Sequence, residues 1–185
     1  MHYEKSLMMK QRKSRDGYTL KILNRKTQKF CRDFDCKNEY INKFIRDTAI
    51  DDVDSTTFIY IDNKTQKAIC AYSLACSGIV ANLSDKLYVY PAVEIKIFAL
   101  DKEYQHRKFS ESKKSVTFGD VFLAYVIDSI GDFTENYCGA SRIVLYSVPE
   151  YVNFYKRNFF KCFEDFMSPD ESIVNQDCVL MFYLF

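Results

Sequence analysis

Apolar and β-branched residues dominate the segment V-E-I-K-I-F-A-L at positions 93–100, a pattern that predicts a buried strand. A charged loop follows it, and residues 117–130 are then apolar on most sides, as expected for a buried helix. Thr117 and Asp120 have the spacing of a capping box at the start of that helix, and Gly131 is placed to cap its end. The first turn of a helix carries N–H groups without an intrahelical acceptor and a partial positive charge. A strand that leads through a loop into a helix start is therefore suited to bind a phosphate.

The pattern before this segment predicts three strands and one helix. The helix is amphipathic, spans 39–49 and is capped by Asn38. Its core-facing stripe is expected to hold Tyr40, Ile41, Phe44, Ile45 and Thr48, and its outer face Asn42, Lys43, Arg46 and Asp47. The strands are expected at 18–23, 57–61 and 68–77, with a loop at 29–38 and an antiparallel hairpin that turns at Asp62 and Asn63.

After the central segment, strands are predicted at 142–147 and 178–185, and residues 84–91 are expected to be a connection. A short helix is expected to begin at S-V-P-E, with Ser147 as its cap. An antiparallel pair followed by a strand–helix–strand unit predicts an α+β, or mixed α/β, fold around a mixed sheet. We expect a single domain over residues 18–185, preceded by a flexible basic segment at 1–17.

Composition narrows the classes of function. The chain has 185 residues, is 48% hydrophobic and carries a net charge of +1, so it can form a core but has no overall field that attracts nucleic acid. Seven scattered cysteines without a CxxC pair, and only two histidines, disfavour a zinc site and a disulfide framework. Neither a signal-peptide pattern nor an apolar run of membrane-spanning length occurs. We therefore expect a cytoplasmic protein with reduced cysteines, no metal and no membrane contact.

Three segments resemble the GNAT N-acetyltransferases, and in particular the branch that contains acetyltransferase toxins. They are I-N-K-F-I-R-D-T-A with the hairpin F-I-Y-I-D-N-K-T-Q-K-A-I-C-A-Y-S-L, the central V-E-I-K-I-F-A-L-D-K-E-Y-Q, and I-V-L-Y-S-V-P-E-Y-V-N-F-Y-K-R-N-F-F. They follow the family's order and cover the chain from Phe30 to its end. The resemblance implies a GNAT fold, a twisted mixed sheet flanked by helices, and acetyl-CoA as co-substrate.

The family's pyrophosphate loop, Gln/Arg-x-x-Gly-x-Gly/Ala, is degenerate in this chain. If Gln105 opens the loop, Lys108 and Ser110 stand where the glycines belong, and the motif fails. If Lys114 opens it, the segment up to Gly119 keeps the last glycine and leads directly into the helix, as phosphate binding requires. We prefer the second register, which makes the charged loop an insertion.

The resemblance also implies roles for single residues. The backbone of Phe98 and Ala99 is expected to pair with the pantetheine arm of acetyl-CoA. Tyr155, in Y-K-R-N-F-F where the family has Tyr-x-x-x-Gly-Phe, resembles the tyrosine that protonates the leaving thiolate. Glu94 is the candidate general base, although Lys96 two residues further on favours a surface ion pair. Contacts to the pyrophosphate are expected from Lys114, Ser115, Val116, Thr117, Phe118, Gly119 and Asp120.

The sequence leaves the acceptor amine open. The toxin-like front half implies aminoacyl-tRNA as acceptor and a small antitoxin as partner, whereas the net charge of +1 gives tRNA little support over a small amine or a protein amine. A homodimer also stays open. The alternative from another class is a GNAT-like binding module that has lost acetyl-CoA binding, and the missing loop glycines are its main support.

Overall fold

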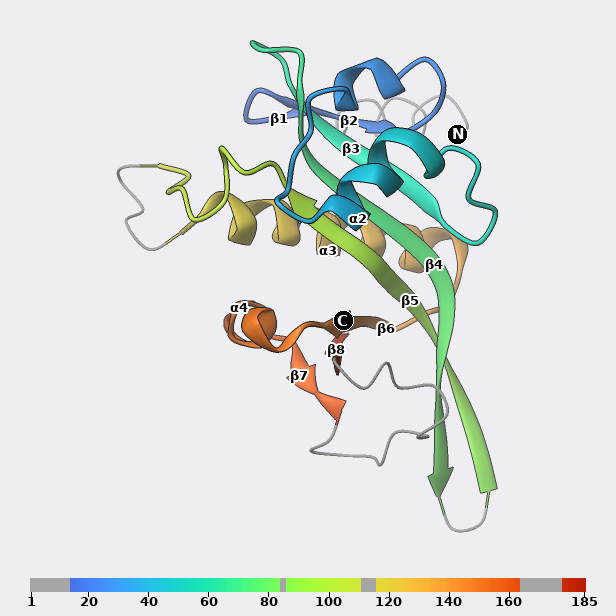
Figure 1. The fold of residues 1–185 in the computed structure, drawn as a ribbon. Helices are drawn as coiled ribbons and strands as arrows, with labels where there is room; N and C mark the ends of the chain where they lie inside the picture. The colour runs from blue at the N-terminus through green and yellow to red at the C-terminus, as the bar shows by residue number, and fades with distance from the viewer. Residues whose placement is uncertain (1–13, 84–85, 111–115, 164–177) are drawn as a thin grey trace. The chain divides into compact units, whose positions relative to one another are not determined.

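In the part of the chain that the structure describes, eight strands form one mixed sheet in the order β1-β2-β3-β4-β5-β6-β8-β7 (Figure 1). The structure, a computed structural model, describes residues 14–83, 86–110, 116–163 and 178–185. None of the helices in these ranges combines the length and the hydrophobicity needed to cross a bilayer. The elements are β1 (Ser14–Arg15), β2 (Tyr18–Ile22), η1 (Gln28–Cys31), α2 (Glu39–Lys43), η2 (Phe44–Thr48), β3 (Thr56–Asp62), β4 (Ala68–Leu83), β5 (Lys86–Leu100), α3 (Phe118–Tyr137), β6 (Arg142–Ser147), η3 (Pro149–Tyr151), α4 (Val152–Arg157), β7 (Lys161–Cys162) and β8 (Val179–Leu184).

The strand pairing confirms the predicted α+β fold around a mixed sheet. β2 is antiparallel to β3, β6 is antiparallel to β8, and β5 is parallel to β6. By its internal contacts the chain divides into two compact units. The first consists of the residues up to Ser73 together with Ile97–Gly119, and the second of Leu74–Lys96 together with Asp120–Phe185.

The start of the first unit is more ordered than the sequence predicts. Residues 1–13 lie outside the described part of the chain, but Ser14 and Arg15 form β1 and pair with β2. Asp16 and Gly17, with φ angles of 51° and 87°, are both left-handed, as the two central residues of a type I′ hairpin turn must be. The segment predicted to be flexible therefore ends in a hairpin that adds one strand to the sheet.

The core of the first unit is built mainly from strands on one side and the η1–α2–η2 segments on the other. Its buried residues are Leu23, Cys31, Phe34, Ile45, Ala49, Ile59, Ile61, Ala68, Ala71 and Ala99. The helix predicted at 39–49 begins as expected, because Asn38 Oδ1 accepts the N–H of Ile41 at 3.2 Å. After α2 it widens into the π-helix η2, in which Ala49 N–H donates to Phe44 O at 2.8 Å.

The predicted faces of this helix are partly wrong. Ile45 is buried as expected, but Tyr40 is 79% exposed and Asn42 is only 2% exposed. Asn42 is buried because its side chain has polar partners: its Oδ1 accepts Cys36 N–H at 2.8 Å, and its Nδ2 donates to Asp35 Oδ1 at 2.9 Å. Partners that come from another segment are invisible to hydrophobic periodicity, which assigns every polar residue to the outside.

The core of the second unit packs β6 and the buried face of α3. One cluster contains Ile79, Ala92, Val144 and Phe163, and α3 contributes the fully buried Phe122, Leu123, Val126 and Ile130. The prediction that Gly131 ends this helix is wrong, because α3 continues to Tyr137. A Cβ at Gly131 would lie 3.1 Å from the ring of Phe185, so this glycine makes room for the C-terminal side chain.

The prediction that residues 84–91 form a connection is wrong for residues 86–91, which belong to β5, and residues 84–85 lie outside the described residues. β4 and β5 continue as a long two-stranded ribbon, drawn with opposite directions in Figure 1. A Cβ at Gly78 in β4 would lie 3.4 Å from Tyr90 O in β5, which shows how closely the two backbones approach. Leu87 and Val89 are 72% and 69% exposed. The ribbon is therefore not held by burial of these side chains, and a burial-based pattern could not reveal it.

Candidate functional site

The parallel pairing of β5 with β6 is short. Within the described residues it joins Val93 to Ile143 and Glu94 to Val144 and extends no further along the two strands. Glu94, the candidate base, therefore marks the end of this ladder. Burial, and after it the carboxylate of Glu94, raises the pKa of Tyr146, two residues beyond the partner of Glu94. The negative charge of Glu94 thus acts on a phenol of the neighbouring strand.

Phe98 and Ala99 lie near the end of β5, in the first unit. Ala99 is 6% exposed and belongs to the core of that unit. Successive side chains of a strand point to opposite faces, so Phe98 points to the other face of the sheet. The predicted role of these two residues concerns their backbone, and it stays a prediction.

Tyr155, the candidate acid, is held by aromatic packing on α4. It is 8% exposed, and the rings of Phe154 and Phe160 lie 5.0 and 5.6 Å from its ring, both near perpendicular. Its carbonyl accepts the N–H groups of Asn158 and Phe160 at 3.0 and 3.1 Å. A tyrosine fixed in this way presents its hydroxyl from one defined position.

The helix that carries Tyr155 starts differently from the prediction. Val148, not Ser147, precedes the first helical residue of η3, and it makes no side-chain cap. Ser147 Oγ instead donates to Val148 O at 2.9 Å. Pro149 occupies the first turn, where its missing N–H costs nothing.

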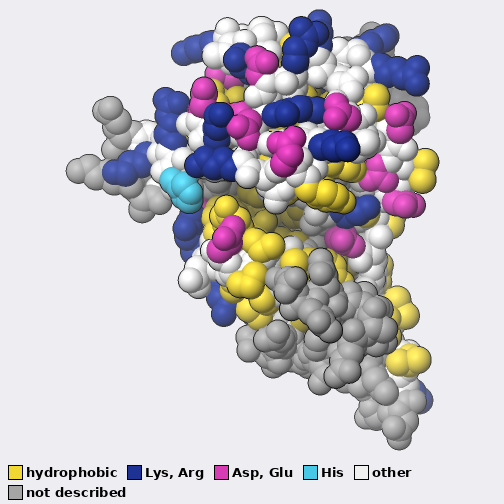
Figure 2. Space-filling model, viewed as in Figure 1, with side chains coloured by type: hydrophobic (Ala, Val, Ile, Leu, Met, Phe, Trp, Pro, Cys, Tyr) yellow, Lys and Arg dark blue, Asp and Glu magenta, His cyan; other side chains and the backbone are white. Residues whose placement is uncertain are grey.

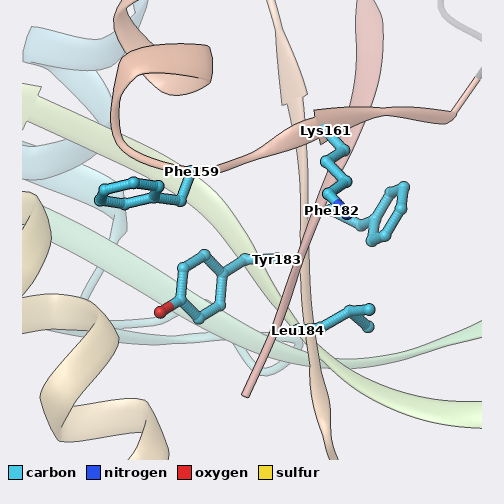
Figure 3. Close-up of a pocket in the computed structure, with 5 residues that line it drawn as sticks. All are labelled: Phe159, Lys161, Phe182, Tyr183 and Leu184. Atoms are coloured by element: carbon cyan, nitrogen blue, oxygen red, sulfur yellow. The ribbon is translucent and has the colours of Figure 1, made fainter.

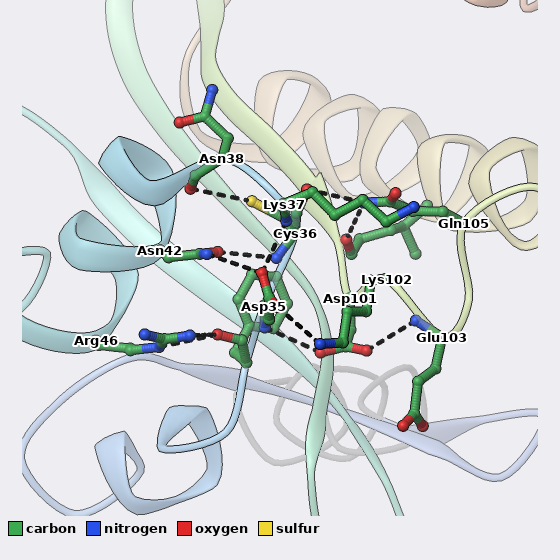
Figure 4. A network of polar contacts seen from close by, with 12 residues as sticks. Asp35, Cys36, Lys37, Asn38, Asn42, Arg46, Asp101, Lys102, Glu103 and Gln105 are labelled. Atoms are coloured by element: carbon green, nitrogen blue, oxygen red, sulfur yellow. Dashed lines mark hydrogen bonds and ion pairs between the residues drawn. The ribbon is translucent and has the colours of Figure 1, made fainter.

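A polar network in the first unit anchors the turn after β5 (Figure 4). The Asp101 carboxylate accepts the N–H groups of Asp35 and Glu103, both at 3.0 Å. Gln105 Nε2 donates to Cys36 O and Leu100 O, also at 3.0 Å. Gln105 would open the pyrophosphate loop in the first register. Its side-chain amide is instead hydrogen-bonded to two backbone carbonyls of the first unit.

We expect this network to make stability depend on pH through Asp35. The Lys102 ammonium at 2.9 Å, followed by the N–H of Lys37 and the side chain of Asn42, holds the pKa of the Asp35 carboxyl well below its usual range. Because the folded pKa is depressed, the stabilisation is complete above the unfolded pKa of about 3.9 and is lost as pH falls below it. Urea unfolding at pH 6 and pH 3 should show a smaller acid-induced loss for Asp35→Asn than for the wild type. The exposed Asp54→Asn is the matched control, and an equal loss in all three proteins would contradict this prediction.

The charged loop after Gln105 folds back on itself. Phe118 N–H donates to Arg107 O and Phe109 N–H donates to Val116 O, both at 3.0 Å, and Lys108 and Thr117 form a β-bridge between these bonds. Below this pairing Phe118 is 5% exposed, with the rings of Tyr104 and Phe109 both 5.0 Å away. Residues 107–109 and 116–118 thus pair with each other where the predicted insertion meets α3, and residues 111–115 lie outside the described part of the chain.

This pairing changes the predicted pyrophosphate site. Lys114 and Ser115 lie outside the described residues. Of the remaining predicted donors, Phe118 N–H already has Arg107 O as its acceptor. Gly119 follows in the first turn of α3, where the N–H points out of the helix start. At least one of the predicted N–H donors is therefore already engaged within the chain, and phosphate binding at this helix start stays a prediction.

Asp120 faces α4 rather than an open helix start. Its Oδ1 accepts Arg157 Nε and Asn158 Nδ2, each at 2.9 Å. The guanidinium offsets a carboxylate that would otherwise repel an anion at this helix start. Asp120 thus ties α3 to the C-terminal end of α4, a role that the sequence did not suggest.

Two of the buried cysteines, Cys31 and Cys70, offer no nucleophile. Burial raises the pKa of the Cys31 thiol to about 12 and raises the pKa of Cys70 as well, so both stay protonated at neutral pH.

On the face drawn in Figure 2, Lys and Arg side chains alternate with Asp and Glu side chains over the region of α2 rather than forming one basic patch.

Comparison with solved structures identifies the fold. A tyrosine-to-phenylalanine mutant of the toxin AtaT, bound to the C-terminus of the antitoxin AtaR and to acetyl-CoA, matches with a TM-score of 0.63 and 16% identity over 91% of this chain and 94% of that chain. A tyrosine-to-phenylalanine mutant of KacT matches with a TM-score of 0.67 and 16% identity over 91% and 95%. AtaT complexed with acetyl-methionyl-tRNAfMet matches with a TM-score of 0.66 and 16% identity over 90% and 94%.

The chain has the GNAT fold. The fold predicted from the sequence resemblance is thereby confirmed over about nine-tenths of this chain and of each matching chain. Neither a protein-family model nor a curated protein matches the sequence. At 16% identity the structural likeness establishes the GNAT fold and leaves the activity to be proposed.

Two features that matter for this GNAT fold were missed by sequence reasoning. One is the pairing of Asp120 with Arg157 and Asn158, which lie 37 and 38 residues apart from it in the sequence. The other is Phe159, which has a φ angle of +69° and is 80% exposed. The second had a signal, because Phe159 occupies the position of the missing glycine in Tyr-x-x-x-Gly-Phe.

Proposed function

We propose that this chain is an N-acetyltransferase that moves the acetyl group of acetyl-CoA onto a primary amine, and that the amine is that of an aminoacyl-tRNA. The observation that carries the proposal is the match of the whole fold to AtaT, which was solved both with acetyl-CoA and with acetyl-methionyl-tRNAfMet. The match spans about nine-tenths of each chain.

In this proposal, the strand and the helix start bind the co-substrate. The backbone of Phe98 and Ala99 pairs with the pantetheine arm, in line with the short parallel ladder between β5 and β6. The N–H of Gly119 and the charged segment before α3 meet the pyrophosphate. Arg157, paired with Asp120, keeps the first turn of α3 from repelling it.

The reaction is direct attack in a ternary complex. The amine nitrogen forms a bond to the thioester carbonyl carbon, and the carbon–sulfur bond breaks. Tyr155 donates its phenolic proton to the departing sulfur, and the proton lost by the amine passes to Glu94, directly or through water. Backbone N–H groups of β5 stabilise the oxyanion that forms in between.

The proposal is tested with purified protein, radiolabelled acetyl-CoA and tRNA charged with methionine. We expect calorimetry to show one acetyl-CoA bound per chain, and label to appear in N-acetyl-methionyl-tRNA. Uncharged tRNA is the matched control, because it lacks the amine. Binding without transfer to any charged tRNA would overturn the acceptor, and no binding at millimolar acetyl-CoA would overturn the acetyltransferase.

The second candidate function is a GNAT-like binding module without catalysis. One observation favours it: Phe118 N–H, at the expected phosphate site, donates to Arg107 O instead. A module of this kind would bind its partner, for which a small antitoxin is our proposal, while binding neither acetyl-CoA nor CoA. The same calorimetric titration separates the two functions.

A further inference from the structure

Two tyrosines and an arginine form an aligned stack on the second unit. The rings of Tyr88 and Tyr90 in β5 are near parallel, with an angle of 16° between their planes and 6.4 Å between their centroids. The guanidinium carbon of Arg142, the first residue of β6, lies 4.2 Å from the centroid of the Tyr90 ring. All three residues belong to the second unit. We call these three side chains the tyrosine–arginine stack.

The stack reaches from the core out to solvent. Tyr90 packs against the core cluster of the second unit, whereas Tyr88, further along the ribbon, is 43% exposed. Lys86 is also exposed and, two residues before Tyr88, lies on the same face of the strand. Among the described residues, no carboxylate forms a salt bridge with Lys86 or with Arg142. Single-stranded nucleic acid binds to surfaces of this kind, because bases stack on the rings and phosphates pair with the cations.

The stack shares one face of the sheet with Glu94, the candidate base. Side chains alternate along a strand, so Tyr90 and Glu94 point to the same face of β5. Because Glu94 pairs with Val144, this face also includes Val144 and, two residues before it, Arg142. Tyr90 and Glu94 are four residues apart, which corresponds to about 13 Å along the strand. An extended ligand that lies along β5 can therefore contact the stack and present its end to Glu94.

The same face continues across β6 onto β8. Arg142 pairs with Leu184 in the antiparallel ladder of these two strands. Figure 3 shows Leu184 and Phe182 on one side of β8, and Phe159 and Tyr183 on the other. Within β6 and β8, both of which are described over their full length, no residue is a carboxylate. The positive charge of Arg142 is thus not offset by either of these strands.

We propose that the tyrosine–arginine stack binds the single-stranded 3′ end of the acceptor tRNA. This inference rests on the proposed function and names the part of the substrate that the second unit holds. The amino acid of a charged tRNA is attached to the last adenosine of this strand. The bases before that adenosine stack on Tyr88 and Tyr90, Arg142 pairs with a phosphate, and the amine at the end of the strand reaches Glu94. Stacking acts at short range, so this contact does not require a large overall positive charge, which the chain, at +1, lacks.

The test measures equilibrium binding of the full-length chain to a tRNA and to the same tRNA without its single-stranded 3′ end. The wild type should bind the intact tRNA at least about 10-fold more tightly than the shortened one, since one lost base–aromatic stack is of this size. Tyr88→Ala should lose about 10-fold in affinity for the intact tRNA and keep the wild-type affinity for the shortened one. Tyr88→Trp should bind both as the wild type does. Val89→Ala is the matched control, because Val89 is 69% exposed but points to the opposite face of the ribbon.

Salt dependence tests the arginine. Arg142→Gln should reduce the slope of log Kd against log salt concentration by about 0.7, the value for one phosphate contact on a single strand. An unchanged slope would remove Arg142 from the phosphate contact and overturn that part of the proposal.

Three results would overturn the tRNA contact as a whole. One is equal affinity of the wild type for the two tRNAs, and another is a loss in Tyr88→Ala that is the same for both. The third is a dimer of the wild type that Tyr88→Ala dissociates in sedimentation while tRNA binding is unchanged, which would assign the stack to a second copy of the chain. Binding as expected without acetyl transfer to charged tRNA would overturn the proposed function and support the stack as an RNA contact.

Discussion

Replacing Tyr155 by phenylalanine should lower kcat for acetyl transfer about 100-fold or more while the Kd for acetyl-CoA stays the same. The substitution removes only the hydroxyl, and the ring keeps its packing between Phe154 and Phe160. General acid catalysis by a positioned side chain contributes roughly 10²–10⁴-fold, which sets the size of the loss. Rapid-quench assays with charged tRNA, at saturating acetyl-CoA, measure kcat separately from binding.

Tyr151→Phe is the matched control for this experiment. Tyr151 precedes α4 and is 45% exposed, so loss of its hydroxyl should leave kcat within about twofold. Equal activity of Tyr155→Phe and the wild type would remove Tyr155 from the reaction and reduce it to a packing residue. If Tyr155→Phe lowered both kcat and the thermal midpoint, loss of structure rather than loss of the acid would explain the lower kcat.

The order of the elements could be predicted because each strand and helix has a local pattern. The strand of residues 142–147 and the hairpin at Asp62 and Asn63 are found where alternation and turn chemistry place them. Local pattern also explains the errors in boundaries. Residues 86–91 lack a signature of burial because Leu87 and Val89 are exposed in the ribbon.

The candidate site was less predictable, because its decisive contacts join distant segments. The pairing of Phe118 N–H with Arg107 O closes the loop where the preferred register expects a phosphate. The bond from Asn158 to Asp120 spans 38 residues and connects two helices. The hydrophobic periodicity of a single segment carries no information about its contacts with a distant segment. The sequence did show that Phe159 replaces the glycine of the family motif. In the structure this residue has a strained, left-handed backbone.

Asn42→Leu should lower the free energy of unfolding by about 2–4 kcal/mol, even though it makes the helix more apolar. The side chain is 2% exposed, and its loss leaves Cys36 N–H without the acceptor that it now has at 2.8 Å. It also removes the amide that donates to Asp35 at 2.9 Å. Urea unfolding monitored by circular dichroism gives the difference directly.

Tyr40→Ala is the informative comparison, because the sequence pattern and the structure disagree about this residue. The pattern places Tyr40 in the core, where truncation of an aromatic costs about 3–5 kcal/mol. The structure leaves it 79% exposed, for which the expected change is within about 0.5 kcal/mol. A large loss for Tyr40→Ala together with a small one for Asn42→Leu would mean that α2 packs in the phase predicted from periodicity. The opposite result would show that the hydrogen bonds of a single buried asparagine, rather than hydrophobicity, set the phase of this helix.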